Sequence, residues 1–267
     1  MVLKLYWCRG KGRDDPGQCN FGDFLSPLIV EMAAGRAVEY APIHKADMMA
    51  IGSIMNREVK ARRLLLPRRL HVWGSGTDAP GRAFSARHHY HAVRGSHTRD
   101  QITGEGFSAV ALGDPGLLAN EWWSGRPRPG KRYTLGVIPH YVDRDDAAVQ
   151  RVAMQPGVRI IDVYWPVEDV LKAIQECHFI LSSSMHGLIV ADAFGIPNRR
   201  VVLSQGMISD FKFVDYYSAF GLAEPASLTA GDLAGATAAS AERLVGEYLR
   251  PGLDGIKRGL LSAFPSL

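Results

Sequence analysis

A serine-rich segment with one histidine holds the side chains best suited to chemistry. Ser182, Ser183 and Ser184 follow a short apolar run, and His186 and Gly187 come shortly after them. Hydroxyls and free backbone N–H groups at the start of a helix suit a phosphate or a carboxylate. An imidazole beside them can accept or donate a proton near neutral pH. The segment therefore predicts an anion-binding catalytic site; the alternative is a histidine bonded only to backbone.

Glycine and serine also follow several other apolar runs. Such turns let backbone N–H groups come close to a ligand, although any strand-to-helix turn favours glycine. The turns are Gly52-Ser53, Gly74-Ser75-Gly76 and Gly95-Ser96. None of them matches the dinucleotide pattern G-x-G-x-x-G or a P-loop. The sequence therefore gives little support to NAD or ATP as a ligand.

Short apolar runs alternate with helix-like segments, which predicts an α/β fold with parallel sheets. The expected strands are 3–7, 47–51, 70–73, 91–94, 133–138, 158–163, 179–181 and 200–203, and the expected helices include 24–34, 167–176 and 188–194. The Pro/Gly/Arg-rich segment 125–130 has the composition of a linker. We therefore expect two Rossmann-like doubly wound domains, residues 1–126 and 127–267, facing a cleft. Ligands of such sheets bind at the carboxyl ends of the strands, where the Gly/Ser/His clusters fall.

Composition and length place the chain among ordinary globular proteins. Its 267 residues, 46% hydrophobic and 22% charged, suit one large or two small domains with a sizeable core. No apolar run of about 18 residues occurs, and the N-terminal apolar run is too short for a secretory signal. We therefore expect a cytoplasmic protein. The three cysteines match neither a disulfide framework nor a zinc pattern, so reduced thiols are expected.

Basic residues outnumber acidic ones, and the net charge is +4. They gather in segments 57–69 and 126–132. A solvated basic face, an anionic substrate and an anionic membrane surface would each explain this pattern. Nucleic acid is not an expected partner, because no basic stripe interleaved with aromatics and no known nucleic-acid motif occurs.

Several pieces of the sequence, taken in order, resemble the polysaccharide pyruvyl transferase family. The main one is the serine-rich strand end, the histidine and the helix ending in Gly-Ile-Pro, residues 182–197. The others are 20–23, 74–76, 93–95, 98–100, 112–115, 135–140 and 211–217. No single piece is specific, but their joint order is, over roughly residues 18–222.

The resemblance implies a GT-B-like fold and a defined reaction. Family members move a pyruvyl group from phosphoenolpyruvate onto two hydroxyls of a sugar, which makes a cyclic ketal and releases phosphate. It implies phosphoenolpyruvate as a co-substrate with no further cofactor. It also implies an oligosaccharide acceptor that is lipid-linked, and hence peripheral association with the inner face of the membrane.

A donor with a phosphate and a carboxylate needs arginines and backbone N–H groups around it. Many family members carry an arginine two residues before the histidine, where this chain has Ser184. We expect Arg94 and Arg99 to replace it. The predicted donor-binding residues are Arg94, Arg99, Ser182, Ser183, Ser184 and Gly187.

Ketal formation protonates the donor's methylene carbon and deprotonates the attacking hydroxyl, so it needs groups that titrate near neutral pH. His186 and His140 are the predicted catalytic residues, with Asp23 to orient a histidine or bind an acceptor hydroxyl. Helix capping is the alternative role for Asp23, and a turn is the alternative for Asp114. The predicted acceptor side of the cleft holds Asn20, Gly74, Ser75, Gly76 and Asp114.

His88, His89 and His91 form a dense cluster, and the last two would share one face of a strand. No carboxylate or cysteine follows closely enough to complete a metal site, so no metal is predicted. Two other functions stay open: a nucleotide-sugar-dependent glycosyltransferase, and a catalytically inactive relative that binds carbohydrate or anions.

Overall fold

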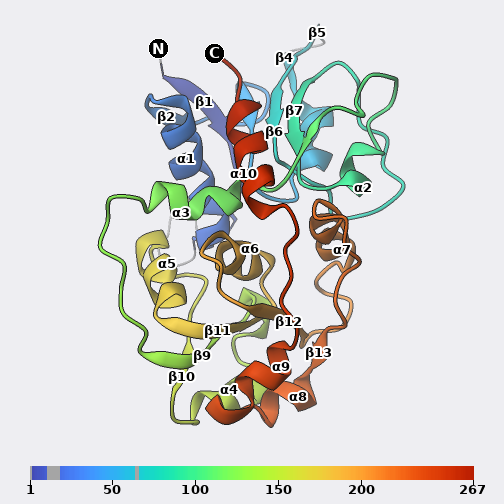
Figure 1. Cartoon of the computed structure of the whole chain (residues 1–267). Helices are drawn as coiled ribbons and strands as arrows, with labels where there is room; N and C mark the ends of the chain where they lie inside the picture. Colours follow the sequence, from blue (N-terminus) through green and yellow to red (C-terminus); the bar gives the residue numbers. More distant parts are fainter. Residues whose placement is uncertain (1, 11–18, 64–65) are drawn as a thin grey trace.

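Two parallel β-sheets with helices around them form two lobes, one above the other in Figure 1. The computed structural model describes residues 2–10, 19–63 and 66–267. The strand order is β2-β1-β3-β6-β7-β8 in the first sheet and β10-β9-β11-β12-β13 in the second. Neighbouring strands are parallel throughout both sheets. The predicted α/β fold with two parallel-sheet domains is confirmed.

The strands of the two sheets are short, with two to six residues each. The first sheet contains β1 (Leu3–Tyr6), β2 (Val38–Tyr40), β3 (Met48–Met49), β6 (His71–Trp73), β7 (His89–Val93) and β8 (Ala111–Leu112). The second contains β9 (Tyr133–Ile138), β10 (Val158–Ile160), β11 (Cys177–Ser182), β12 (Asn198–Val202) and β13 (Leu228–Thr229). A hairpin, β4 (Arg62–Arg63) and β5 (Leu66–Pro67), lies in the basic segment 57–69, of which residues 64 and 65 fall outside the described ranges.

Helices connect the strands of each lobe. The α-helices are α1 (Phe21–Ala34), α2 (Ser96–Arg99), α3 (Ala119–Trp122), α4 (Ala147–Ala153), α5 (Val167–Gln175), α6 (Met185–Ala193), α7 (Phe211–Ser218), α8 (Ala230–Ala234), α9 (Ala241–Val245) and α10 (Leu253–Ser262). Short 3-10 helices are η2 (Met55–Lys60), η3 (Pro115–Leu118), η4 (Tyr141–Asp143) and η5 (Ala238–Ser240). Helices α8, α9 and α10 all lie within the last 40 residues.

The start of α1 is fixed by its cap. The Asn20 side chain accepts a hydrogen bond of 3.0 Å from the backbone N–H of Gly22, which satisfies one of the free donors of the first turn. The helix therefore begins at Phe21, three residues before the expected start at Phe24. Gly35, with φ at 61°, ends the helix in the left-handed conformation that glycine adopts without strain.

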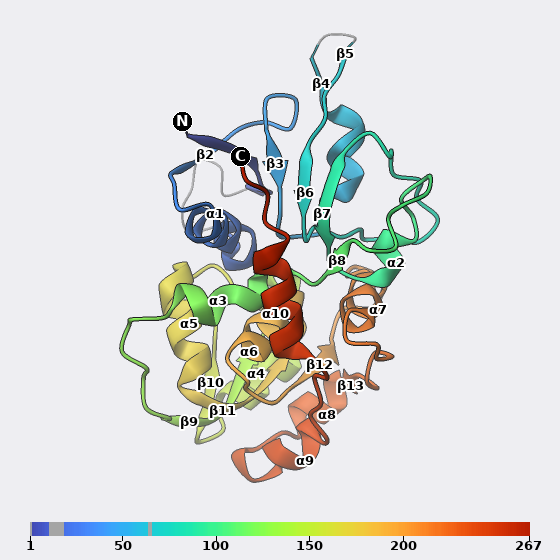
Figure 2. The same cartoon turned by 45° about the horizontal axis from the view of Figure 1, so that its top comes forward.

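The two lobes share a hydrophobic core. One continuous cluster of buried side chains includes Phe21 and Leu117 from the first half of the chain and Ile138 and Leu188 from the second. Helix α6 is apolar and buried on almost every side because it lies between β11, α3, α5 and η3. Figure 2 shows it between the two sheets. Burial of this kind holds the carboxyl ends of both sheets close together.

The C-terminal helix returns to the first sheet. Helix α10 contacts β8, and the Trp73 indole Nε1 donates a 2.9 Å hydrogen bond to the Leu260 carbonyl oxygen. The chain therefore passes from the first lobe to the second near residue 126 and returns to the first lobe at α10. The division into domains at that residue stays a prediction.

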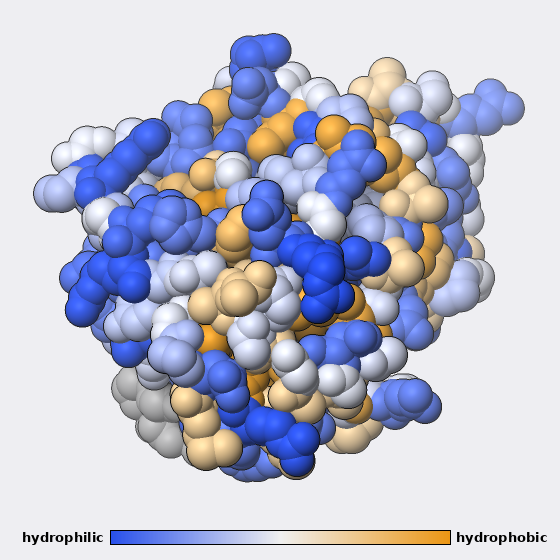
Figure 3. All heavy atoms as spheres, turned by 60° about the horizontal axis from the view of Figure 1, so that its bottom comes forward, coloured by the Kyte–Doolittle hydropathy of each residue, from blue (hydrophilic) through white to orange (hydrophobic). Residues whose placement is uncertain are grey.

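Hydrophilic residues cover much of the face drawn in Figure 3. On the face drawn in Figure 3, hydrophobic residues reach the surface in several small areas among hydrophilic ones. In the described part of the chain, none of the helices has the length and apolar content needed to cross a bilayer.

Candidate active site

A cavity of about 340 Å³ lies between the lobes, at the carboxyl ends of both sheets. Its wall comes from the first turn of α1, the loops after β1, β3 and β9, the loop before α5, and the first turns of α6 and α7. The lining residues are Cys8, Gly10, Asn20, Asp23, Gly52, Ser53, His140, Tyr141, Tyr164, Ser184, Met185, His186 and Lys212. The location is the one that parallel sheets favour for ligands.

His186 stands at the second position of α6, and its imidazole crosses to the other lobe. A Cβ atom built on Gly22 of α1 would lie 2.1 Å from its Nδ1, so only glycine permits this approach. Among the described residues, the buried Nε2 has no hydrogen-bond partner. Burial lowers the pKa of His186 to about 3, and the nearby charges of Lys212 and Arg94 act in the same direction. The ring is therefore neutral near pH 7 and retains one unused nitrogen.

Asp23 lies across the same cavity, in the first turn of α1. Burial raises the pKa of its carboxyl to about 7, opposed by the Lys212 charge and by the thiol of Cys8 within hydrogen-bonding reach. A carboxyl of this kind carries its proton for much of the time near neutral pH. The helix cap is Asn20, so Asp23 is not the capping residue. The cavity thus holds a proton donor and a neutral imidazole, on different lobes.

His140 is the second imidazole on the wall, at the end of β9. Its Nδ1 accepts a long hydrogen bond of 3.4 Å from the Val142 N–H at the start of η4. Its ring packs on Tyr141 with 4.2 Å between centroids. Burial and the Lys212 charge lower the pKa of His140 to about 4. This ring is also neutral near pH 7, and its Nδ1 is already engaged.

The three serines have different surroundings. The Ser182 hydroxyl donates to the Ile138 carbonyl at 2.8 Å and accepts from the Ser184 N–H at 3.0 Å. The Ser183 hydroxyl donates to the Asp143 carboxylate at 2.6 Å. Of the three, only Ser184 lines the cavity, and its side chain makes no capping hydrogen bond to α6. The first two serines therefore hold the strand end and the loops around it in place.

Neither predicted donor-binding arginine lies on the cavity wall. Arg94 is fully buried, with its Nε 2.8 Å from the Asp215 carboxylate and its Nη1 2.6 Å from the Ser53 hydroxyl. Arg99 pairs with Asp100 at 3.1 Å, near the surface. Arg94 reaches the cavity only through Ser53, which lines it. Sequence alone did not reveal Asp215 as its counter-charge, because 121 residues separate the two.

Of the remaining predicted residues, only Asn20 lines the cavity; the others are buried and do not reach its surface. Gly74, Ser75 and Gly76 are buried against the Pro115 ring, the Ala50 carbonyl and the Arg94 guanidinium. Asp114 is a fully buried cap of η3, where it accepts from the Gly116 N–H at 2.9 Å. The turn role weighed for Asp114 fits this position. Gly187 does not line the cavity but packs closely against Ser182, since a Cβ on Gly187 would lie 2.4 Å from the Ser182 hydroxyl oxygen.

Six lining residues were not among the predicted site residues or turns: Cys8, Gly10, Tyr141, Tyr164, Met185 and Lys212. Tyr141 and Tyr164 stack with 6.1 Å between ring centroids, which gives one wall an aromatic surface. Lys212 was noted only as part of a family segment, and no helix was expected around it. Burial lowers the pKa of its amine to about 8.

Within the described ranges, no group of three His, Cys, Asp or Glu side chains converges in a way that would hold a metal ion. In the histidine cluster, His88 contacts Glu58 at 2.5 Å and His91 contacts His71 at 2.9 Å. The rings of His71 and His91 are stacked face to face. The cluster lies on β6, β7 and the segment before β7, and none of its histidines lines the cavity.

Known proteins are similar in sequence to parts of this chain. The succinoglycan biosynthesis protein ExoV of Rhizobium meliloti is 27% identical over 210 residues, 76% of this chain and 62% of that protein. An uncharacterised protein of Acanthamoeba polyphaga mimivirus is 30% identical over 158 residues, 57% of this chain and 55% of that protein. The chain thus spans less than two thirds of the length of either relative. A family model described as polysaccharide pyruvyl transferase matches residues 64–203. Since that match covers more than half of the sequence, the chain belongs to the polysaccharide pyruvyl transferase family.

Proposed function

We propose that this protein transfers a pyruvyl group from phosphoenolpyruvate to two hydroxyls of a sugar in an exopolysaccharide, forming a cyclic ketal and releasing phosphate. One observation carries the proposal. His186 and Asp23 share a cavity between the lobes, one as a neutral imidazole with an unused nitrogen and the other as a carboxyl that keeps its proton near neutral pH. Pyruvyl transfer needs one group that accepts a proton and one that donates a proton. Asp23 titrates near neutral pH, whereas burial takes the pKa of His186 well below that range.

In the first step, the His186 imidazole accepts the proton of one sugar hydroxyl while the oxygen of that hydroxyl attacks C2 of the donor. Asp23 gives its proton to C3, so the methylene becomes a methyl group and the C2–C3 double bond becomes a single bond. Both groups have the protonation state that this step requires near neutral pH. The product is a phosphorylated ketal carbon bonded to one sugar oxygen.

In the second step, the bond from C2 to the phosphate oxygen breaks and a second sugar hydroxyl bonds to C2. The proton of that hydroxyl leaves with the phosphate, and the proton on His186 returns to Asp23 through solvent or the product. The two hydroxyl protons thus end on C3 and on phosphate, which balances the reaction. The stacked rings of Tyr141 and Tyr164 offer an apolar surface on which a sugar ring can pack.

The finer features of this proposal follow from the family. We propose a GT-B-like placement of the two lobes, phosphoenolpyruvate as the donor, and no further cofactor. The acceptor would be an oligosaccharide repeat unit carried on a lipid, handled on the cytoplasmic face of the membrane by peripheral association. The net charge of +4 supports an anionic partner surface.

The test uses phosphoenolpyruvate labelled with 13C at C3 and succinoglycan-type oligosaccharides from which pyruvate has been removed by mild acid. We expect phosphate release that depends on the acceptor, and a new ketal methyl resonance in the saccharide. His186→Ala serves as the inactive control, and a UDP-sugar replaces the donor in a parallel reaction. Sugar transfer from the UDP-sugar without any ketal methyl signal would overturn the proposal.

A further inference from the structure

The cavity contains one basic side chain that no acidic group neutralises by direct contact. Lys212 is the single lysine or arginine on the wall in the part of the chain that the structure describes. Within those same ranges, its Nζ forms neither an ion pair nor a hydrogen bond, and its side chain is half-buried. The Nζ lies 5.3 Å from the centroid of the Phe213 ring, a cation–π contact that leaves the charge without an anionic partner. A largely buried amine is more stable when an anion pairs with it. The cavity therefore has an unfilled position for a negative group.

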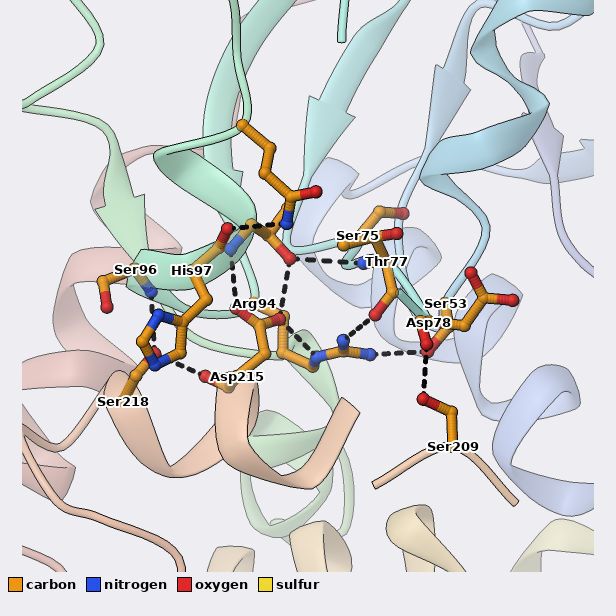
Figure 4. A network of polar contacts seen from close by, with 12 residues as sticks. Ser53, Ser75, Thr77, Asp78, Arg94, Ser96, His97, Ser209, Asp215 and Ser218 are labelled. Atoms are coloured by element: carbon orange, nitrogen blue, oxygen red, sulfur yellow. Dashed lines mark hydrogen bonds and ion pairs between the residues drawn. The ribbon is translucent and has the colours of Figure 1, made fainter. Parts of the chain in front are cut away.

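Lys212 lies on helix α7, and residues of the first lobe bind to this helix and fix its position. Asp215, one turn after Lys212, accepts hydrogen bonds from the Arg94 Nε at 2.8 Å and from the N–H and the hydroxyl of Thr98, both at 2.7 Å. Figure 4 shows Arg94 and Asp215 within this network of polar contacts. We call Arg94, Thr98 and Asp215 the Asp215 clamp. It joins the first lobe to the helix that carries Lys212.

Further contacts show how closely α7 approaches the first lobe. The Ser96 N–H donates to the Ser218 hydroxyl at 2.8 Å, also drawn in Figure 4. A Cβ on Gly95 would lie 1.7 Å from the Asp215 carbonyl oxygen, so any other residue would push the helix away. Residues three apart on a helix are neighbours on its surface. Displacement of Asp215 therefore moves Lys212 as well.

We propose that Lys212 holds an anionic group of the donor in the cavity, and that Arg94 is a positioning residue that acts on it through the Asp215 clamp. The proposal rests on the function proposed above and names the contact that this function left unassigned. In this proposal Arg94 does not bind the donor itself but positions Lys212. The first turn of α6, whose Ser184 side chain makes no capping bond, faces the same cavity and adds free N–H donors for an anion.

Isothermal titration calorimetry at about pH 7 tests the contact, with phosphoenolpyruvate, inorganic phosphate and pyruvate as separate probes. Lys212→Met removes the charge and keeps the length of the side chain. Lys212→Arg keeps a charge, and Lys172→Met changes an exposed lysine of α5 as the matched control. We expect Lys212→Met to weaken phosphoenolpyruvate binding by about 10- to 100-fold, the usual loss for a charged hydrogen bond. Lys172→Met should bind like the wild type.

The outcomes separate this proposal from the proposed function. If the wild type does not bind phosphoenolpyruvate, the proposed function fails and this inference falls with it. If the wild type binds and Lys212→Met binds within about threefold of it, only the lysine contact is refuted, since a lost charged contact costs more. The probe whose binding Lys212→Met weakens, phosphate or pyruvate, identifies the anionic group that the lysine meets.

A pH series adds a second readout. Burial is the main reason that the pKa of Lys212 is lowered to about 8; the charges of Arg94 and Arg200 lower it further, and those of Asp23 and Asp78 raise it. The two imidazoles of the cavity are uncharged above pH 7. Binding to the wild type should therefore weaken as the pH rises above about 8, when the amine loses its proton. Lys212→Arg should not lose affinity there, because a guanidinium stays charged. Equal pH profiles would contradict the role of the lysine charge.

Removal of Arg94 itself would leave the buried Asp215 without its counter-charge and destabilise the fold, so a milder change tests the clamp. Thr98→Ala deletes one hydrogen bond to Asp215. We expect about a three- to tenfold loss of phosphoenolpyruvate affinity in the wild type and no further loss in Lys212→Met. An equal loss in both backgrounds would show that the clamp does not act through Lys212, and would refute the positioning role.

Discussion

Replacement of Asp23 by asparagine should change how the stability of the protein depends on pH. Burial raises the pKa of this carboxyl from 3.8 to about 7. Below pH 3.8 both the folded and the unfolded chain are protonated there, and the stabilising contribution of the proton is fully present. As the pH rises to about 7 the unfolded chain ionises first, so the free energy of unfolding decreases across that range.

The size of the decrease follows from the raised pKa. Each pKa unit corresponds to about 1.4 kcal/mol, which gives an upper limit of about 4 kcal/mol between pH 3.8 and pH 7. Water in the cavity reduces the electrostatic penalty, so we expect a decrease of about 2–3 kcal/mol. Asparagine has a similar shape but does not titrate. The variant should therefore lack this part of the pH dependence.

Equilibrium urea unfolding, followed by circular dichroism between about pH 4 and about pH 8, measures the effect. Asp145→Asn, at an exposed carboxyl, is the matched control and should keep the wild-type profile. The wild type should lose stability relative to Asp23→Asn as the pH rises. Parallel profiles for these two proteins would show that the carboxyl ionises normally, and Asp23 could then not act as the proton donor.

Three further substitutions test the packing and the chemistry around the cavity. Gly22→Ala should lower the free energy of unfolding by about 1–3 kcal/mol, displace the His186 ring and reduce turnover, because the added methyl group would overlap the ring. Gly255→Ala, in open space, should do neither, and equal melting temperatures and rates for the two variants would contradict the close contact. His186→Ala should lower turnover by at least about 100-fold with little change in melting temperature, and unchanged phosphate release would exclude it as the base. Leu260→Ala should cost about 2–5 kcal/mol by urea unfolding, against little for its exposed neighbour Leu261→Ala, and similar midpoints would mean that α10 does not pack on the first sheet.

The sequence predicted those parts of the fold that depend on local pattern. Apolar runs of strand length gave most of the strands of the two sheets to within a few residues. The short strand β2 (Val38–Tyr40) was missed because it is half exposed and has no apolar run. Helix α7 was missed because its charged and aromatic residues gain their stability from the other lobe.

The same distinction holds for the site. His186, His140, Asp23, Asn20 and Ser184 were found because each stands at a strand end or at a helix start, and such positions meet at one edge of a sheet. Arg94 also stands at a strand end, yet its guanidinium pairs with the buried carboxylate of Asp215, more than a hundred residues away in the sequence, and does not reach the cavity. Pairings of this kind decide between a ligand contact and a structural role, and a single sequence does not contain them.

The chemistry of the cavity depends on the joint between the lobes, because the proposed acid lies on one lobe and the proposed base on the other. The backbone N–H of Phe21 donates to the Val163 carbonyl oxygen at 2.8 Å, which ties the start of α1 to the loop that follows β10 in the second lobe. The next residue, Gly22, touches the His186 ring. Asp23 follows directly, so one turn of helix sets both the contact between the lobes and the distance between the two proton carriers. If the lobes moved apart, both sheets would stay intact while acid and base separated. A donor that contacts both lobes would therefore stabilise the closed arrangement by its own binding free energy.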